Sequence, residues 1–279
     1  MKKAIIFMCI SAMAFALLNV FVKNLKDLNV YQIVFFRSIG SLFFTIPLIL
    51  KLKINILGNK KELLIIRGIM GFLAMTLFFM SLKYLTTGSA VSIRYISPIF
   101  AAIFAVFILK EKIKSIQWLY FGIAFLGVII LKGFDTEVVN IGLLYIVLSS
   151  IFTGLVFIII RKIGSRDHPL IIVNYFMVIS TLLAGILVLD NWTKPKGFQW
   201  FILLSLGLFG YYGQYYMTKA LQESEVNKIA PLKYIEVIFT IVIGLIWLKE
   251  IYTLLSILGI VLILIGLTLN TATKGSGSN

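Results

Sequence analysis

Cysteine and histidine are almost absent from this chain of 279 residues, which holds one of each, Cys9 and His168. A single cysteine cannot form a disulfide within the chain, so cysteine usage does not indicate a redox compartment. With so few cysteines and histidines and only 11 acidic residues, there is little material for a nucleophile with its base or for a metal cluster. The sequence therefore predicts no enzymatic activity, no metal site and no cofactor, and His168 is expected to be a solvated loop residue.

Charged residues are also scarce, at 13% of the chain, whereas 60% of the residues are hydrophobic. A soluble domain has about 25% charged and about 45–50% apolar residues, so one globular core could not bury this excess. Apolar runs of about 18 to 22 residues recur along the chain, and each is long enough to cross ~30 Å of hydrocarbon as a helix. The sequence therefore predicts an all-α polytopic membrane protein.

Ten transmembrane helices are expected from these runs. The short connections between them contain Gly, Pro, Asn and clustered charges, which interrupt helices. The predicted spans are about 4–22, 30–50, 63–82, 88–108, 115–132, 141–160, 169–189, 198–218, 227–247 and 252–270.

The 26 lysines and arginines give the chain a formal net charge of +15. They lie in the short connections rather than in one patch, so this charge does not indicate nucleic-acid binding. Of the 26, 15 fall on the side of both termini, 7 on the other side and 4 within spans. Because cytoplasmic loops carry the excess of Lys and Arg, we expect a multi-pass protein of the cytoplasmic (inner) membrane with both termini in the cytoplasm.

An internal repeat relates the two halves of the chain. The stretch "LKEKIKSIQWLYFG" from Leu109 lies over "LKEIYTLLSILGIV" from Leu248, and the same offset places the first residue of "RYISPIF" on the first residue of "KYIEVIF". We therefore expect two five-helix repeats, at 1–135 and 136–272, followed by a flexible tail at 273–279. Because five is odd, the second repeat must be inverted in the membrane, an arrangement typical of secondary transporters.

Cationic side chains within the spans need an explanation, because each ionised group there costs about 2.5–3.5 kcal/mol on insertion scales. Arg94 and Ser97 share one helical face, and Lys233 and Glu236 share the equivalent face of the ninth span. Small residues follow along both faces, which also favours close helix packing. Two hypotheses stay open: these side chains line an aqueous cavity and bind substrate, or they pack helices together, with Glu236 neutralising one cation.

Further polar residues lie within other spans. Arg37 is about seven residues into the second span, where it can extend to the interface or cap the external side of a cavity. Arg67 lies near the cytoplasmic start of the third span, and we expect it to extend to the interface. Gln214 and Tyr211 of "GYYGQYYM" suit a pocket for a small organic solute, although an interfacial aromatic belt is the alternative. Asn19 is an additional candidate.

Two prolines adjoin the basic residues of the repeat. Pro98 follows Arg94, and Pro231 precedes Lys233. A proline leaves the carbonyl four residues earlier without its helical partner. Broken or bent helices at these places would suit a site near the membrane midplane; the alternative is that Pro231 only starts the ninth span.

These features together resemble the EamA-type branch of the drug/metabolite transporter superfamily. The resemblance is carried by the halved topology, "FFRS" in the second span, "YISPIFAAIFAVFILKEKI" in the fourth and "APLKYIEVIFTIVIGLIWLKE" in the ninth, over residues 1–270. It implies a secondary carrier in which spans one to four and six to nine surround a central cavity and spans five and ten lie outside it. It does not name the solute.

The sequence therefore predicts a secondary-active or facilitative transporter that moves a small polar organic metabolite, amino-acid-like or carboxylate-bearing, by alternating access. The excess of in-span cations over Glu236 favours a carboxylate, and Glu236 is also a candidate proton-coupling group. A carrier for a nucleobase or an S-adenosylmethionine-like metabolite is the alternative, and a solute channel is the alternative from another class. The expected partners are the solute, the lipid bilayer and, if Glu236 titrates, a proton; the protein is expected to be a monomer or homodimer.

Overall fold

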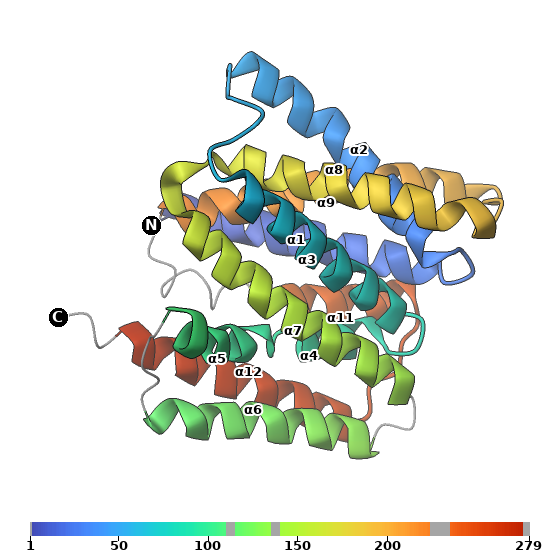
Figure 1. The fold of residues 1–279 in the computed structure, drawn as a ribbon. Helices are drawn as coiled ribbons and strands as arrows, with labels where there is room; N and C mark the ends of the chain where they lie inside the picture. Colours follow the sequence, from blue (N-terminus) through green and yellow to red (C-terminus); the bar gives the residue numbers. More distant parts are fainter. Residues whose placement is uncertain (1, 110–114, 135–139, 224–234, 276–279) are drawn as a thin grey trace.

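The computed structural model describes residues 2–109, 115–134, 140–223 and 235–275, in which every regular element is a helix (Figure 1). The α-helices are α1 (Lys2–Asn24), α2 (Val30–Lys51), α3 (Lys61–Ser81), α4 (Thr87–Arg94), α5 (Ser97–Leu109), α6 (Ser115–Phe134), α7 (Asn140–Ile163), α8 (Pro169–Val188), α9 (Phe198–Glu223), α11 (Ile235–Trp247) and α12 (Leu254–Gly275).

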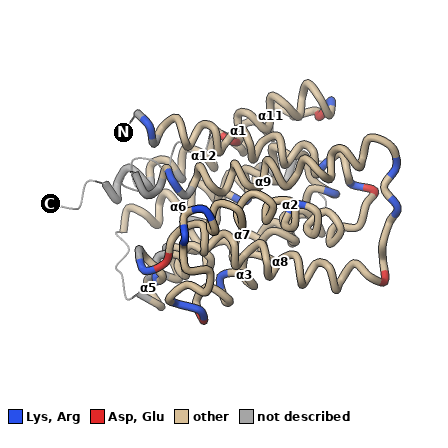
Figure 2. The backbone as a smooth tube through the Cα atoms, turned by 90° about the horizontal axis from the view of Figure 1, so that it is seen from above, with Lys and Arg blue, Asp and Glu red and all other residues tan. Residues whose placement is uncertain are grey.

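The helices have the length and composition of membrane spans. Six segments of the described chain are long and apolar enough to cross a bilayer, with α4 and α5 together forming one of them, and shorter apolar helices lie within α6, α11 and α12. Charged residues lie mostly toward the two ends of the bundle (Figure 2). The prediction of an all-α polytopic membrane protein is confirmed.

Local capping explains where several helices begin. The side chain of Asn29 accepts a hydrogen bond from the backbone N–H of Tyr31 at the start of α2, at 2.8 Å. At the start of α8, Nδ1 of His168 accepts from the backbone N–H of Leu170 at 3.2 Å, and Pro169 occupies the first helical position. Such caps satisfy N–H groups that have no partner within their helix. The single histidine of the chain is therefore a helix cap.

The two halves fold alike at the predicted offset. α2 and α8 begin at Val30 and Pro169, and α6 and α12 begin at Ser115 and Leu254. In each pair, the two helix starts are as many residues apart as the two Leu-Lys-Glu elements of the repeat. α1 begins at the end of the bundle marked N and α7 begins at the opposite end, as an inverted repeat requires (Figure 1). The first turn of α1 and the last turn of α12 lie at the same end.

Contacts between the halves follow a two-fold pattern. α6 packs on α12 and α2 on α8, each against its own repeat equivalent, whereas α1 packs on α9 and α3 on α7. Because α1 corresponds to α7 and α3 corresponds to α9, exchange of the two halves converts the α1–α9 contact into the α3–α7 contact. α6 and α12 lie together at one edge of the bundle (Figure 1), so the fifth and tenth spans lie outside the helices that enclose the centre.

The fourth span is broken in its middle. α4 ends at Arg94 and α5 begins at Ser97. Pro98 has no N–H for the carbonyl of Arg94, which is the partner that a continuous helix would require. In the second half, α11 begins at Ile235, the repeat equivalent of Ile96. In the first half, α5 is thus a separate helix that starts inside the bundle.

In the second half, a break in the ninth span is expected near Pro231 and Lys233, and both residues lie outside the described part of the chain. Whether the ninth span is broken in the same way therefore stays a prediction.

Carboxylates of the second half cap helices of the first half at both ends of the bundle. Asp167 accepts from the backbone N–H of Asn59 at 2.5 Å and of Lys60 at 3.0 Å, directly before α3. Glu250 accepts from the backbone N–H of Thr87 at 2.9 Å and from its hydroxyl at 2.7 Å, at the start of α4. Because α4 follows α3 along the chain and begins near the end of α3, the two caps lie at opposite ends of the bundle.

Tyr252 completes the cap at Glu250. Its hydroxyl donates to Oε2 of Glu250 at 2.5 Å and accepts from the backbone N–H of Gly88 at 3.1 Å. Burial and the neighbouring carboxylate raise the pKa of the Tyr252 hydroxyl well above its usual range. The hydroxyl therefore keeps its proton at neutral pH and remains a donor to Glu250.

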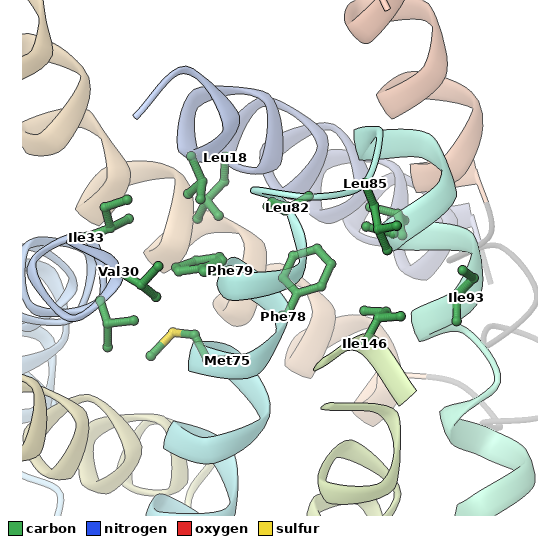
Figure 3. Close-up of a cluster of buried hydrophobic side chains, with 14 of the residues drawn as sticks. Leu18, Val30, Ile33, Met75, Phe78, Phe79, Leu82, Leu85, Ile93 and Ile146 are labelled. Atoms are coloured by element: carbon green, nitrogen blue, oxygen red, sulfur yellow. The ribbon is translucent and has the colours of Figure 1, made fainter. Parts of the chain in front are cut away.

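Glycines allow α2 and α9 to touch backbone to backbone. A Cβ added at Gly207 would lie 2.5 Å from the Cα of Gly40, and one added at Gly40 would lie 2.9 Å from the Cα of Gly207. Such contact requires small residues on both helices. The remaining interior is filled mainly by apolar side chains, among them Met75, Phe78 and Phe79 of α3 (Figure 3).

Gly207→Ala should destabilise the protein, because its methyl group would meet backbone that cannot move aside. Overpacking of this kind costs about 1–3 kcal/mol, so we expect a lower unfolding temperature in detergent. Gly122→Ala is the matched control, since an added Cβ there meets nothing within 4 Å. Equal unfolding temperatures for the two variants would contradict the close contact of α2 and α9.

Glu250→Ala should also lower the unfolding temperature, because it leaves the start of α4 and the Tyr252 hydroxyl without their acceptor. Loss of a helix cap costs about 1–2 kcal/mol. Glu62→Ala is the control, since Glu62 is an exposed acidic residue in the first turn of α3. The capping role would be wrong if thermal unfolding of the two variants were indistinguishable.

Candidate functional site

A cavity of about 130 Å³ lies in the centre of the bundle, between α1, α2, α3, α4, α7, α8 and α9. Much of its wall is aromatic. The phenylalanines that line it are Phe15, Phe78, Phe79, Phe157 and Phe176, and the polar residues that line it are Asn19, Arg37, Arg67, Arg94, Thr153 and Gln214.

Beside this cavity, the carboxylate of Glu236 joins three elements. Its Oε1 accepts from Nη2 of Arg94 at 2.8 Å and from Nδ2 of Asn19 at 3.0 Å, and its Oε2 accepts from the hydroxyl of Tyr95 at 2.7 Å. Glu236 is fully buried, whereas the Arg94 side chain is 19% exposed. A buried carboxylate requires such partners, because desolvation without them is costly.

The ends of two helices favour this ion pair. Arg94 is in the last turn of α4, and Glu236 is in the first turn of α11. The C-terminus of a helix carries a partial negative charge and the N-terminus a partial positive one. Each side chain therefore has the sign of charge that its own helix end stabilises, and the break in the fourth span is what brings the end of α4 to this place.

Arg37 enters the cavity from α2. It is 4% exposed, and its guanidinium carbon lies 5.7 Å from the ring centre of Phe79 and 6.0 Å from that of Phe176. Its Nη1 contacts the sulfur of Met75, and its buried Nε has no hydrogen-bond partner in the described chain. Arg37 therefore lines the cavity and does not extend to the interface; that it caps the external side stays a prediction.

Arg67 also points inward, so the expectation that it extends to the interface is wrong. It is 4% exposed, and its guanidinium carbon lies 4.3 Å from the ring centre of Phe176. Gly71, one turn further along α3, leaves the space: a Cβ there would lie 3.2 Å from Nη1 of Arg67. Buried Nε and Nη1 of Arg67 have no hydrogen-bond partner in the described part of the chain.

The other candidate residues divide into two groups. Gln214 and Asn19 line the same cavity as the arginines. Tyr211 does not line it; its ring stacks on Phe44, with 5.2 Å between ring centres, and it borders a separate, smaller pocket. Ser97 is buried where the start of α5 packs on α7, also away from the cavity wall.

Lys233 lies outside the described residues, so its predicted role as a substrate-binding residue stays a prediction. Sequence reasoning did not single out Tyr95, although it stands in the repeated stretch that contains Arg94. For Arg67, the available signal was the spacing of Gly71 and Ala74 after it, at four and seven residues, which marks a helical face with room for a long side chain.

The cavity has a surplus of positive charge. Of the described residues, three guanidinium groups line it, and one carboxylate, that of Glu236, is paired with Arg94. The guanidinium of Arg94 also lies 3.9 Å from the ring centre of Phe78. Arg37 and Arg67 contact aromatic rings rather than carboxylates, and a ring face stabilises a cation without neutralising it. The site can therefore attract an anionic group.

Glu236→Ala should be strongly destabilising, because it leaves Arg94 without its partner. Breaking a buried ion pair costs about 3–5 kcal/mol, whereas replacing both partners costs much less. We expect the unfolding temperature in detergent to fall for Glu236→Ala and to recover in part when Arg94→Gln is added. Additive losses in this double-mutant cycle would show that the two side chains are not coupled.

Comparisons with known proteins agree with this architecture. The model of the EamA-like transporter family matches residues 2–132 and again residues 140–272. A protein of known crystal structure superposes on the chain with a TM-score of 0.73 at 14% identity, covering 99% of this chain and 98% of that one. It is a match of fold alone.

Named transporters are similar in sequence. The pseudopaline exporter CntI of Pseudomonas aeruginosa is 27% identical over 278 residues, which cover 98% of each chain. Human solute carrier family 35 member G1 is 29% identical over 88% of this chain and 72% of its own length. The S-adenosylmethionine uptake transporter of Rickettsia prowazekii is 24% identical over 76% of this chain and 73% of its own. With a family match in each half, this chain belongs to the EamA-like transporter family of the drug/metabolite transporter superfamily, a family of membrane transporters and not of enzymes.

Proposed function

We propose that this transporter moves a small carboxylate-bearing metabolite across the cytoplasmic membrane by alternating access. The observation that carries the proposal is the surplus of positive charge in the central cavity, where the described wall contains the unneutralised guanidinium groups of Arg37 and Arg67. A charge buried without a partner is costly. A carboxylate that enters the cavity relieves this cost through charge-assisted hydrogen bonds to the guanidinium groups.

Two features of the fold support alternating access over a channel. The three arginines and the amides of Asn19 and Gln214 lie around one cavity in the described chain, whereas a channel would require a continuous polar path through the bundle. Asp167 and Glu250 hold the two halves together at opposite ends of the bundle. Releasing one of these caps while the other stays closed would open the cavity to one side only.

The names of the similar proteins give two further solutes to compare with simple carboxylates. One is named for export of pseudopaline and another for uptake of S-adenosylmethionine, so relatives differ in both solute and direction. The amides of Asn19 and Gln214 and the aromatic wall could hold an uncharged part of either kind of solute. The charge of the cavity favours solutes in which the carboxylate is not outweighed by cationic groups.

Glu236 is the group that we propose for any coupling to protons. It is the carboxylate that adjoins the cavity in the described chain, and it holds α4, α1 and α11 together through its three partners. Protonation would weaken its pairing with Arg94 and so loosen the contact between the two halves. Transport driven by a proton gradient that Glu236→Gln abolishes would support this coupling.

Neutralising the cavity arginines should impair transport in proteoliposomes. We expect Arg37→Gln and Arg67→Gln each to lower counterflow of an accepted solute among glutamate, succinate and citrate by ~10-fold or more, because a charge-assisted hydrogen bond is lost. The assay would compare glutamate, succinate and citrate with S-adenosylmethionine and adenine, as labelled solutes.

Arg166→Gln is the matched control for that experiment, since Arg166 is an exposed arginine in the connection between α7 and α8. It should transport at the rate of the unaltered protein. Counterflow of adenine in the absence of any carboxylate counterflow would overturn the proposed solute class. Counterflow of S-adenosylmethionine alone, whose carboxylate is outweighed by its cationic groups, would contradict the preference for an anionic solute.

A further inference from the structure

Two of the three cavity arginines lack a counterion in the described chain, and both lie against the same ring. The guanidinium carbons of Arg37 and Arg67 lie 6.0 Å and 4.3 Å from the centre of the Phe176 ring, so their separation cannot exceed the sum of these two distances. Arg94 differs, because Glu236 already pairs with it. The cavity thus presents two positive groups against one ring, with a separation that this sum limits.

The placement of Arg37 is built into the repeat. At the offset that aligns Leu109 with Leu248, position 37 corresponds to position 176, and Gly71 corresponds to Gly210. An added Cβ at Gly71 would lie 2.8 Å from the Phe176 ring, and one at Gly210 would lie 3.3 Å from Nε of Arg37. The glycine of each half therefore leaves space for a side chain of the other half: Gly71 for Phe176, and Gly210 for Arg37. Of these two equivalent side chains, the one from the first half is a cation.

Both arginines line the cavity, and both have buried N–H groups without a partner among the described residues. Nε of Arg37 and both Nε and Nη1 of Arg67 are buried without a hydrogen-bond partner among the described residues. Each residue is more than nine-tenths buried, so the loss of water from these N–H groups is uncompensated unless a ligand supplies acceptors. A single carboxylate carries one charge and can neutralise one of the two cations.

We propose that the cavity recognises a compact solute with two carboxylate groups, one bound by Arg37 and the other by Arg67, with its apolar middle against Phe176. This inference rests on the proposed function and narrows its solute class from carboxylates to dicarboxylates. Both cations are then neutralised, and the donors of both arginines gain charge-assisted hydrogen bonds. The small cavity, of about 130 Å³, restricts the solute to a short spacer between the two groups.

The test is a comparison of matched ligands by isothermal titration calorimetry on the purified full-length protein in detergent. Succinate, glutarate and adipate would be compared with butyrate, valerate and hexanoate, which have the same chain lengths and one carboxylate fewer. Sodium chloride would hold the ionic strength constant. We expect at least one dicarboxylate to bind ~10-fold more tightly than its monocarboxylate partner, from one added charge-assisted pair.

Single variants should separate the contributions of Arg37 and Arg67 to dicarboxylate binding. In Arg67→Gln, dicarboxylate affinity should fall ~10-fold while monocarboxylate affinity changes less than about twofold, because Arg37 still binds one carboxylate. Arg37→Gln should give the same pattern, and Arg166→Gln should change neither affinity. The ligand series on the unaltered protein stands even if a variant does not fold.

The outcomes distinguish this inference from the function on which it rests. Equal affinities for each matched pair of ligands would overturn the dicarboxylate inference and leave carboxylate transport standing. Failure of every mono- and dicarboxylate to bind would contradict the proposed function itself. Loss of dicarboxylate preference in Arg166→Gln would show that the preference does not arise in the cavity.

Discussion

The ion pair between Arg94 and Glu236 is the interaction on which the centre of the protein depends. It connects the end of a broken span in the first half to the start of a short helix in the second half, and each charge suits the helix end that carries it. Tyr95 and Asn19 complete the hydrogen bonding of the carboxylate. The pair therefore connects the two repeats, and its arginine forms part of the cavity wall.

Because this pair uses the carboxylate, the other cavity arginines remain unneutralised within the described chain. Arg37 and Arg67 are held by contacts with aromatic rings and with sulfur, which stabilise a cation weakly compared with a carboxylate. Under the proposed function, the solute supplies the missing negative charge, and a site already neutralised by the protein would have little affinity for such a solute. The inverted repeat supplies the enclosing helices twice but supplies these cations from the first half alone.

The fold followed from the sequence because its determinants are local and repeated. Hydropathy set the spans, the alignment of the two Leu-Lys-Glu elements set the equivalent helices, and Pro98 indicated the break after Arg94. The site followed only in part. The direction of Arg67 depends on Gly71 and on a ring from α8, and the separation of Tyr211 from the cavity depends on its stacking with Phe44. Contacts between distant helices decide such matters, and one sequence does not record them.

The reactivity of a thiol placed in the cavity wall tests most directly whether the chamber is accessible to water and positively biased. Thr153 lines the cavity, so Thr153→Cys would be introduced with Cys9→Ala, which removes the natural thiol. Anionic sulfonatoethyl and cationic trimethylammonioethyl methanethiosulfonates would then be compared. With each rate divided by that reagent's rate with a free thiol in solution, we expect the anionic reagent to react ~10-fold faster and Arg37→Gln to reduce this preference. Faster reaction of the cationic reagent, or no reaction with either, would contradict this expectation.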